Sequence, residues 1–371
     1  MVPVGGRPFL EHLVGLLRDN GITEIVLLVG YLAEKIITHF GDGSQFGVSI
    51  KYSIGTESDL TGTRIRNAAS LLADKFLLLY GDNYWPMRLG KMLDFYKSKS
   101  AIGTLVAYSN IHGDAEHGSQ NNLRIEADGR VTHYGAFSDD PSLNGVDIGF
   151  FLMNKQIVRM MPADNFSFEQ VILPRLIEQG TLFAYHTDHP YHAITTVAQL
   201  PVMAEFLRPK RVIFLDRDGV INRQMPPHDY VKNWAEFEFL PGALEALRLL
   251  SQASYQIYIV TNQRGIARGL MTEADLDDIH QRMQAAITAA GGQIADIYYC
   301  PHNYDDNCDC RKPKAGMFTR AAREHNLDLS RTLFIGDNES DVVSGRARGA
   351  EALIVSSDHN LLATVQQLLS Q

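Results

Sequence analysis

An apolar run that stops abruptly at two carboxylates, within residues 211–220, constrains the fold of this chain more than any other feature. It reads Val-Ile-Phe-Leu and is followed directly by Asp216, Asp218 and Gly219. A short continuous apolar run is typical of a strand that is buried in a parallel sheet. The carboxyl ends of such strands face the ligand crevice, so both aspartates are expected there. For these ten residues alone, a strand followed by an ordinary acidic turn is the alternative.

Two later apolar runs in the same half also end in polar side chains. Residues 255–260 lead into Thr261, and residues 331–335 lead into Gly336 and Asp337. Lys312 lies on a loop before a helix expected over residues 316–326. Because the carboxyl ends of parallel strands meet at one edge of a sheet, these side chains are expected to gather beside the two aspartates.

The gathered side chains suit phosphoryl transfer. Asp216 can attack phosphorus, and Asp218 can move a proton to and from the leaving oxygen. A carboxylate nucleophile and a phosphate repel each other, and a Mg²⁺ held by Asp216, Asp337 and a backbone carbonyl near Asp218 would offset that repulsion. Lys312 would neutralise the transferring phosphoryl group. For Asp337 alone, a surface turn is the alternative.

Three cysteines and a histidine form a compact pattern between residues 300 and 310. Cys300 and His302 make Cys-x-His, and Cys308 and Cys310 make Cys-x-Cys after a gap of five residues. These are all the cysteines of the chain, and an odd, clustered set is a poor disulfide framework. Three thiolates and an imidazole suit a closed tetrahedral zinc site. Free thiols in a reducing compartment are the alternative.

The length and charge of the chain bound its class. A chain of 371 residues predicts two domains, which we place at 1–206 and 207–371. The net charge of −9 argues against a general nucleic-acid or membrane-surface binder. No apolar run reaches membrane-spanning length, and the N-terminus lacks the pattern of a secretory signal, so we expect a cytoplasmic protein. An oligomer is compatible with these observations.

The order Asp, Thr, Lys, Asp over residues 210–357 resembles the haloacid-dehalogenase-like phosphohydrolases. That resemblance implies Asp216 as the nucleophile of an aspartyl-phosphate, Asp218 as general acid and base, and Mg²⁺ at Asp337. The phosphate-binding residues that we expect are Thr261, Asn262, Arg264, Arg311 and Lys312. With Arg268, the two arginines supply more cations than one phosphoryl group needs, which fits a second phosphate on the substrate.

The zinc motif and its neighbours narrow the resemblance. The segments VTNQRGIARG and YYCPHNYDDNCDCRKPKAGM look like those of the D-glycero-D-manno-heptose 1,7-bisphosphate 7-phosphatase family, and the histidinol-phosphate phosphatases are the main neighbours with a similar loop. The segment between Asp218 and Thr261 holds only a loop, a helix and a strand, so selectivity must come from short loops rather than a cap domain.

In the first half, strands and helices alternate, which predicts an α/β domain with a largely parallel sheet. Both domains are therefore expected to be Rossmann-like, three-layered α/β units. The segments MVPVGGRPFLEHLVGLLRDNGITEIVLLVGY, LLYGDNYW and FSFEQVILPRL resemble sugar-1-phosphate nucleotidyltransferases. The resemblance implies Asp82 as a metal ligand and Glu169 near the sugar. It also implies a nucleotide sugar as a possible ligand of the first domain.

The first half departs from that family pattern in two ways. The family opens with a strand and a Gly-rich loop that would precede Met1, and its second metal ligand is replaced here by Ala193. Either the true start lies upstream and the protein is bifunctional, or the domain is degenerate. Since alanine cannot bind a cation wherever the chain starts, we expect no useful nucleotidyltransferase activity.

These observations predict a Mg²⁺-dependent, zinc-containing phosphatase that removes the 7-phosphate of a heptose bisphosphate. Its partners are expected to be small sugar phosphates, with no nucleic acid and no membrane. Three alternatives are a sugar-1-phosphate nucleotidyltransferase, a histidinol-phosphate phosphatase, and a non-catalytic sugar-phosphate scaffold. The sequence does not give the anomer of the sugar.

Overall fold

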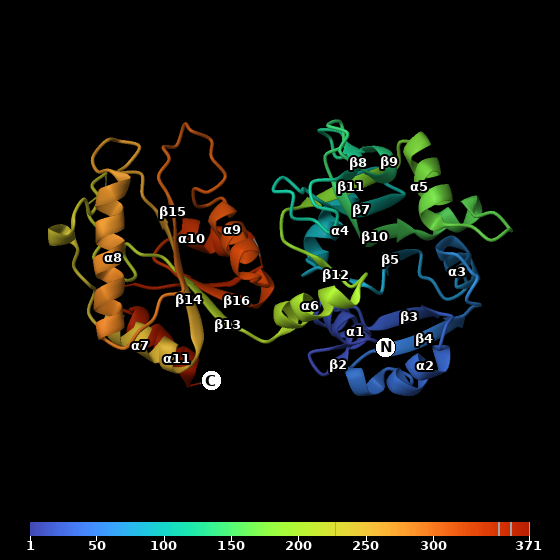
Figure 1. Cartoon of the computed structure of the whole chain (residues 1–371), viewed down its shortest axis with the longest axis horizontal. Coiled ribbons are helices and arrows are strands. Elements are labelled where there is room, and N and C mark those ends of the chain that lie inside the picture. Colours follow the sequence, from blue (N-terminus) through green and yellow to red (C-terminus); the bar gives the residue numbers. More distant parts are fainter. Residues whose placement is uncertain (227, 348, 357, 371) are drawn as a thin grey trace. The chain divides into compact units, whose positions relative to one another are not determined.

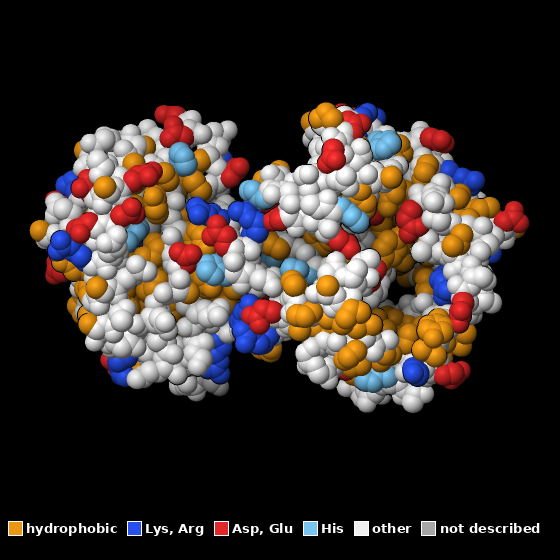
Figure 2. Space-filling model, in the orientation of Figure 1, with side chains coloured by type: hydrophobic (Ala, Val, Ile, Leu, Met, Phe, Trp, Pro, Cys, Tyr) orange, Lys and Arg blue, Asp and Glu red, His pale blue; other side chains and the backbone are white. Residues whose placement is uncertain are grey.

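The computed structural model describes residues 1–226, 228–347, 349–356 and 358–370. It divides into two compact units, Met1–Glu205 and Phe206–Gln371 (Figure 1). Both contain sheets flanked by helices, which confirms the α/β class. No helix among the described residues has the length and apolar character needed to cross a bilayer. Acidic and basic side chains are interspersed over the visible face of each unit (Figure 2).

The second unit is built on a single five-stranded sheet. The strands stand in the order β15-β14-β13-β16-β17, and every neighbouring pair is parallel. Their bounds are β13 Arg211–Leu215, β14 Tyr255–Asn262, β15 Asp296–Cys300, β16 Thr332–Gly336 and β17 Glu351–Ile354. The sheet is therefore the fully parallel one that the apolar runs predict.

Alternate side chains of the central strand β13 enter two separate cores. Ile213 and Leu215 pack with α7, α8 and α11, while Val212 and Phe214 pack with α9, and α10 borders the same core. These helices are α7 Ala243–Gln252, α8 Glu273–Ala289, α9 Gly316–His325, α10 Glu339–Ala347 and α11 Leu361–Leu369. Because successive side chains of a strand point to opposite faces, this alternation gives the three layers.

The first unit has a mixed four-stranded sheet. The order is β11-β7-β10-β5, in which β10 runs antiparallel to β5 and β7 while β11 runs parallel to β7. The bounds are β5 Lys75–Leu79, β7 Gly103–Tyr108, β10 Val146–Asn154 and β11 Leu182–Thr187. A second, parallel pair joins β3 Glu24–Val29 to β4 Ser49–Ile54. The antiparallel β10 makes this sheet less uniformly parallel than that of the second unit.

Smaller elements complete the first unit. The short pairs are β1 Pro3–Val4 with β2 Arg7–Pro8, β6 Asn83–Tyr84 with β12 His192–Ala193, and β8 Asn121–Ile125 with β9 Val131–Ser138. The helices are α1 Phe9–Asp19, α2 Ala33–Phe40, α3 Thr61–Asn67, α4 Leu89–Ser98, α5 Phe168–Glu178 and α6 Leu200–Leu207. The helix expected over residues 63–72 ends at Asn67, and residues 68–71 form turns instead.

Candidate active site of the second unit

Asp216 and Lys312 form a buried ion pair at the carboxyl end of the central strand. Lys312 Nζ lies 2.8 Å from Asp216 Oδ2 and 2.7 Å from Asp341 Oδ1, and it donates a 3.0 Å hydrogen bond to the carbonyl of Val260. The side chain of Lys312 is only 2% exposed. Burial raises the pKa of Asp216 to about 7; Lys312 opposes this rise and Asp341 adds to it. The lysine is thus the cation that opposes the effect of burial on this carboxylate.

Asp337 and Asp341 lie beside Asp216, and together the three form a cluster of ligating oxygens. Asp341 Oδ2 accepts the backbone N–H groups of Asp337 and Asn338, so it fixes the loop after β16. Burial and the Asp341 carboxylate raise the pKa of Asp337 to about 6. Three crowded carboxylates with one lysine between two of them are suited to a divalent cation, which prefers oxygen ligands.

Gly219 allows the close approach of Asp337. Its φ is +87°, a conformation that side chains rarely adopt, and a Cβ placed there would lie 2.2 Å from Asp337 Oδ2. The Asp-Gly turn therefore has a second use besides ending the strand. It makes room for a carboxylate from the neighbouring strand.

Asp218 is held by three side-chain donors. Arg217 Nη2 donates to both carboxylate oxygens at 3.0 Å, Asn222 Nδ2 donates at 2.9 Å, and Gln263 Nε2 donates at 2.7 Å. Burial alone would raise the pKa of Asp218, but the Arg217 charge and these hydrogen bonds outweigh it and hold the pKa below its usual value. His280 lies 3.2 Å from Arg217 and is kept neutral, because burial and the arginine lower its pKa to about 3.

The strand end of β14 supplies the next two expected residues. Thr261 is buried, and its hydroxyl accepts a 2.8 Å hydrogen bond from Gln263. The Asn262 side chain accepts from the backbone N–H of Lys312 at 3.1 Å and donates to its carbonyl at 3.2 Å. This two-way contact holds the backbone of Lys312 against β14, so Asn262 positions the lysine.

The two expected phosphate-binding arginines share one aromatic neighbour. The guanidinium carbon of Arg264 lies 4.1 Å from the ring centroid of Tyr304, and that of Arg311 lies 4.3 Å from it. Arg264 also donates to Asn303 at 2.8 Å. Arg268, which the sequence grouped with them, instead donates to the carbonyl of His228 at 2.6 Å.

The cysteine loop brings its four expected ligands together. Cys300 Sγ lies 3.6 Å from both Cys308 Sγ and His302 Nδ1, and His302 Nδ1 lies 3.2 Å from Cys310 Sγ. All three cysteines are free thiols. These separations are close to those between ligands of a tetrahedral zinc ion with bonds of about 2.0 to 2.3 Å, so the four side chains fit the metal.

The two residues singled out in the first unit have different surroundings. Glu169 accepts hydrogen bonds from Thr61 and Ser167 at 2.7 and 2.6 Å, and also from Tyr80. Asp82 is exposed and belongs to none of the clusters of three or more ligating side chains among the described residues. The chain next to it is the β12 segment, since Ile194 N–H donates to the Asp82 carbonyl at 2.8 Å. Ala193, which cannot bind a cation, therefore lies beside Asp82.

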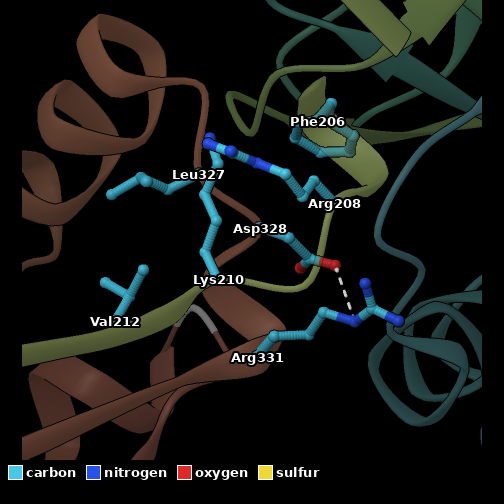
Figure 3. A pocket seen from close by; sticks show the side chains of 7 residues that line it. All are labelled: Phe206, Arg208, Lys210, Val212, Leu327, Asp328 and Arg331. Atoms are coloured by element: carbon cyan, nitrogen blue, oxygen red, sulfur yellow. Dashed lines mark ion pairs between the residues drawn. The ribbon is translucent and has the colours of Figure 1, made fainter. Parts of the chain in front are cut away.

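A small pocket of the second unit lies away from these carboxylates (Figure 3). Lys210 and Val212 line it at the start of β13, and Arg331, which precedes β16, pairs with Asp328 at 3.7 Å. It therefore lies at the amino ends of the parallel strands. The carboxylates lie at their carboxyl ends, so this pocket is not part of the site.

Comparison with known proteins places the chain in a family. Residues 309–368 match the HAD-hydrolase-like family model, and residues 1–182 match the nucleotidyl transferase model. A D-glycero-beta-D-manno-heptose-1,7-bisphosphate 7-phosphatase from Pseudomonas aeruginosa is 40% identical over 148 residues, which are 40% of this chain and 82% of that protein. The phosphatase of the same name from Pseudomonas putida is 39% identical over 147 residues, which are 40% of this chain and 83% of its own. The chain belongs to this heptose-bisphosphate phosphatase family.

A solved structure with the same kind of name was also found. It is D,D-heptose 1,7-bisphosphate phosphatase from B. bronchiseptica complexed with magnesium and phosphate, 34% identical, with 43% of this chain and 98% of that chain covered and a TM-score of 0.38. The phosphatase relatives match two fifths of this chain. The nucleotidyl transferase match falls inside the first unit.

Sequence reasoning missed several residues of this heptose-bisphosphate phosphatase relative. Arg217, Asn222 and Gln263 surround Asp218, and Tyr304 contacts two arginines. Arg217 had a signal, because a charged residue between two buried aspartates must find a partner. Asn222, Gln263 and Tyr304 had none, since their roles depend on how the loops fold back.

Proposed function

We propose that the second unit is a Mg²⁺-dependent phosphatase that removes the 7-phosphate of D-glycero-D-manno-heptose 1,7-bisphosphate. The observation that carries the proposal is the buried Asp216–Lys312 pair, 2.8 Å apart, at the carboxyl end of the central parallel strand. The choice of substrate is supported by two relatives, 40% and 39% identical, that are named as phosphatases of this bisphosphate. A cytoplasmic location suits both a sugar-phosphate substrate and reduced thiols.

In the first half of the reaction, a carboxylate oxygen of Asp216 attacks phosphorus. The new O–P bond forms as the bond from phosphorus to the sugar oxygen breaks, and a proton taken from solvent passes through Asp218 to that oxygen. Lys312 stabilises the charge on the phosphoryl oxygens. The Thr261 hydroxyl, one strand away, orients the same group as a donor.

In the second half, water attacks phosphorus and displaces the Asp216 carboxylate. Asp218, now deprotonated, accepts a proton from the water as its oxygen attacks the aspartyl-phosphate, and the acyl-phosphate O–P bond breaks. This step releases inorganic phosphate and restores the Asp216 carboxylate. Asp218 suits the second role directly, because Arg217, Asn222 and Gln263 hold it in its charged form.

The carboxylate cluster fits a magnesium ion. Asp216 and Asp337, with a backbone carbonyl near Asp218, would hold it. Asp341 is the third carboxylate of the cluster and contacts Lys312. When bound, Mg²⁺ supplies the positive charge that reduces repulsion between the nucleophile and the phosphate. The Cys300, His302, Cys308 and Cys310 set would hold a zinc ion that orders the loop before Lys312.

The test is phosphate release from a substrate panel. The panel contains both anomers of heptose 1,7-bisphosphate, fructose 1,6-bisphosphate and histidinol phosphate. We expect Mg²⁺-dependent release from one heptose anomer, abolished in Asp216→Asn. Preference for histidinol phosphate would support the neighbouring family instead, and release by Asp216→Asn would refute the assigned nucleophile.

For the first unit, we infer that nucleotidyl transfer does not occur in this chain, although residues 1–182 match that family. The inference rests on Ala193, which lies beside Asp82 where a second carboxylate would be needed to hold a cation. Incubation with a nucleoside triphosphate and heptose 1-phosphate should give no nucleotide sugar. Its formation would contradict the inference.

A further inference from the structure

Arg217, which lies between the two aspartates after β13, is a fully buried arginine. Its side chain is 0% exposed, whereas that of its neighbour Asp218 is 25% exposed. Arg217 Nη2 donates to both carboxylate oxygens of Asp218 at 3.0 Å. Burying a guanidinium is unfavourable unless its N–H groups find acceptors, so this group needs a partner besides Asp218.

His280 of α8 is that second partner. Arg217 Nη1 lies 3.2 Å from His280 Nε2. A guanidinium has donors only, so Nε2 accepts the hydrogen bond and the proton of the neutral imidazole is on Nδ1. Burial and the arginine charge lower the pKa of His280 to about 3, which keeps it an acceptor at neutral pH. Arg217 Nε is buried without a hydrogen-bond partner among the described residues. The guanidinium is thus held through its terminal nitrogens, one by His280 and the other by Asp218.

His280 differs in its anchoring from the other groups around Asp218. Asn222 and Gln263, which also donate to Asp218, lie in the loops after β13 and β14. His280 is itself buried, on the helix α8, whose apolar side chains pack in one core with those of the sheet (Figure 1). Groups on packed helices and strands hold a site more precisely than groups on loops. Through Arg217, α8 therefore fixes the direction of the Asp218 carboxylate.

We propose that His280 is a positioning residue for the acid–base carboxylate, a role that rests on the proposed phosphatase function. It fixes the Arg217 guanidinium, which in turn holds Asp218 toward the sugar oxygen that leaves and the water that attacks. A proton passes between Asp218 and each of these oxygens, so a displaced carboxylate slows both halves of the reaction. Because His280 is buried behind Arg217, its loss lowers kcat and leaves KM unchanged.

The test measures kcat and KM for heptose 1,7-bisphosphate in three variants of His280. His280→Gln places an amide oxygen near the position of Nε2 and should keep kcat close to the wild-type value. His280→Asn, whose amide is one bond shorter, and His280→Leu, which has no acceptor, should lower kcat by at least about tenfold, a part of the 10²–10⁴ that a positioned acid and base supply. KM should not change in any of them. If His280→Leu does not fold, the two amide variants decide the question alone.

The matched control is Met283→Ala, because Met283 is fully buried on the same face of α8 and packs in the same core. It removes packing and leaves the contact between His280 and Arg217, so it should lower the Tm of the second unit and keep kcat. Nitrogen NMR of histidine-labelled wild type, with the His280 signal assigned by its loss in His280→Gln, should show an unprotonated Nε2 at neutral pH.

Three kinetic results would overturn the role of His280: unchanged kcat in His280→Asn and His280→Leu, a raised KM with unchanged kcat, or failure of His280→Gln to restore kcat. Two others count against it equally, a loss of kcat in Met283→Ala as large as that in His280→Leu and a protonated Nε2 in the wild type. No phosphate release by the wild type would instead refute the proposed function, and the role of His280 with it.

Discussion

Replacing Lys312 with methionine tests the buried charge balance of the site. Lys312 Nζ contacts Asp216, Asp341 and the Val260 carbonyl within 3.0 Å, and its side chain is almost fully buried. Methionine keeps most of the volume and removes the charge. The substitution leaves the buried carboxylates of Asp216 and Asp341, whose oxygens lie within 4.8 Å of each other, without their shared cation.

The expected cost is large because the remaining charges are buried. Removing one partner of a buried ion pair destabilises a protein by about 3–5 kcal/mol. The same loss raises the pKa of Asp216 further, because Lys312 is the group that lowers it against burial. At pH 7 the nucleophile would then be mostly protonated. With the loss of charge stabilisation on the phosphoryl group, kcat should fall by at least about 10²–10³.

The assay can report on the second unit alone. The chain has two tryptophans, Trp85 in the first unit and Trp234 in the second, where it stacks on Phe237 at 4.9 Å. In a Trp85→Phe background, urea unfolding followed by fluorescence therefore measures the free energy of unfolding of the second unit. Adding Asp341→Asn to Lys312→Met removes one of the stranded charges, so the double variant should be more stable than the sum of the single effects.

An additive double variant would refute the reasoning, since it would mean that the two side chains do not share one charge balance. A Lys312→Met variant with wild-type stability would refute it as well. Loss of stability without loss of kcat would separate the structural role of Lys312 from its role in the reaction.

Three further perturbations follow from the geometry. Gly219→Ala should push Asp337 away and weaken Mg²⁺ activation at least about tenfold, measured by Mg²⁺ titration of phosphate release; unchanged activation would contradict the 2.2 Å approach. Cys308→Ser should reduce the zinc content, measured by mass spectrometry, below the one ion per chain expected for the wild type, and it should lower the Tm of the second unit. Equal zinc in both proteins would contradict the proposed site. Burial raises the pKa of Asp147 to about 7, so the folded first unit loses stability as the pH rises from the unfolded pKa of about 4 to 7 and Asp147 becomes charged. Asp147→Asn should therefore stabilise the first unit by roughly a few kcal/mol at pH 8 and by little at pH 4, measured by thermal unfolding.

The parallel sheet of the second unit was predictable because its signal is local. Each apolar run predicts a strand, and each polar strand end predicts a place at one edge. The structure accordingly brings Asp216, Asp337 and Lys312 together, and it places Thr261 at the end of the neighbouring strand. The mixed sheet of the first unit was less predictable, because the direction of β10 depends on pairing with strands far along the chain.

The parts of the site that escaped prediction are set by loop geometry. Gln263 donates to Asp218 only because the chain turns back after β14, and Tyr304 meets Arg264 only because the cysteine loop folds toward that turn. Asp341 shares Lys312 with the nucleophile. It lies in the first turn of α10, where its carboxylate accepts the backbone N–H groups of Asp337 and Asn338.

The most direct test of the central claim is the phosphorus NMR spectrum of the products from heptose 1,7-bisphosphate. Removal of the 7-phosphate predicts inorganic phosphate together with a surviving anomeric phosphate, and no reaction with Asp216→Asn. Accumulation of heptose 7-phosphate, or turnover by Asp216→Asn, would contradict the account.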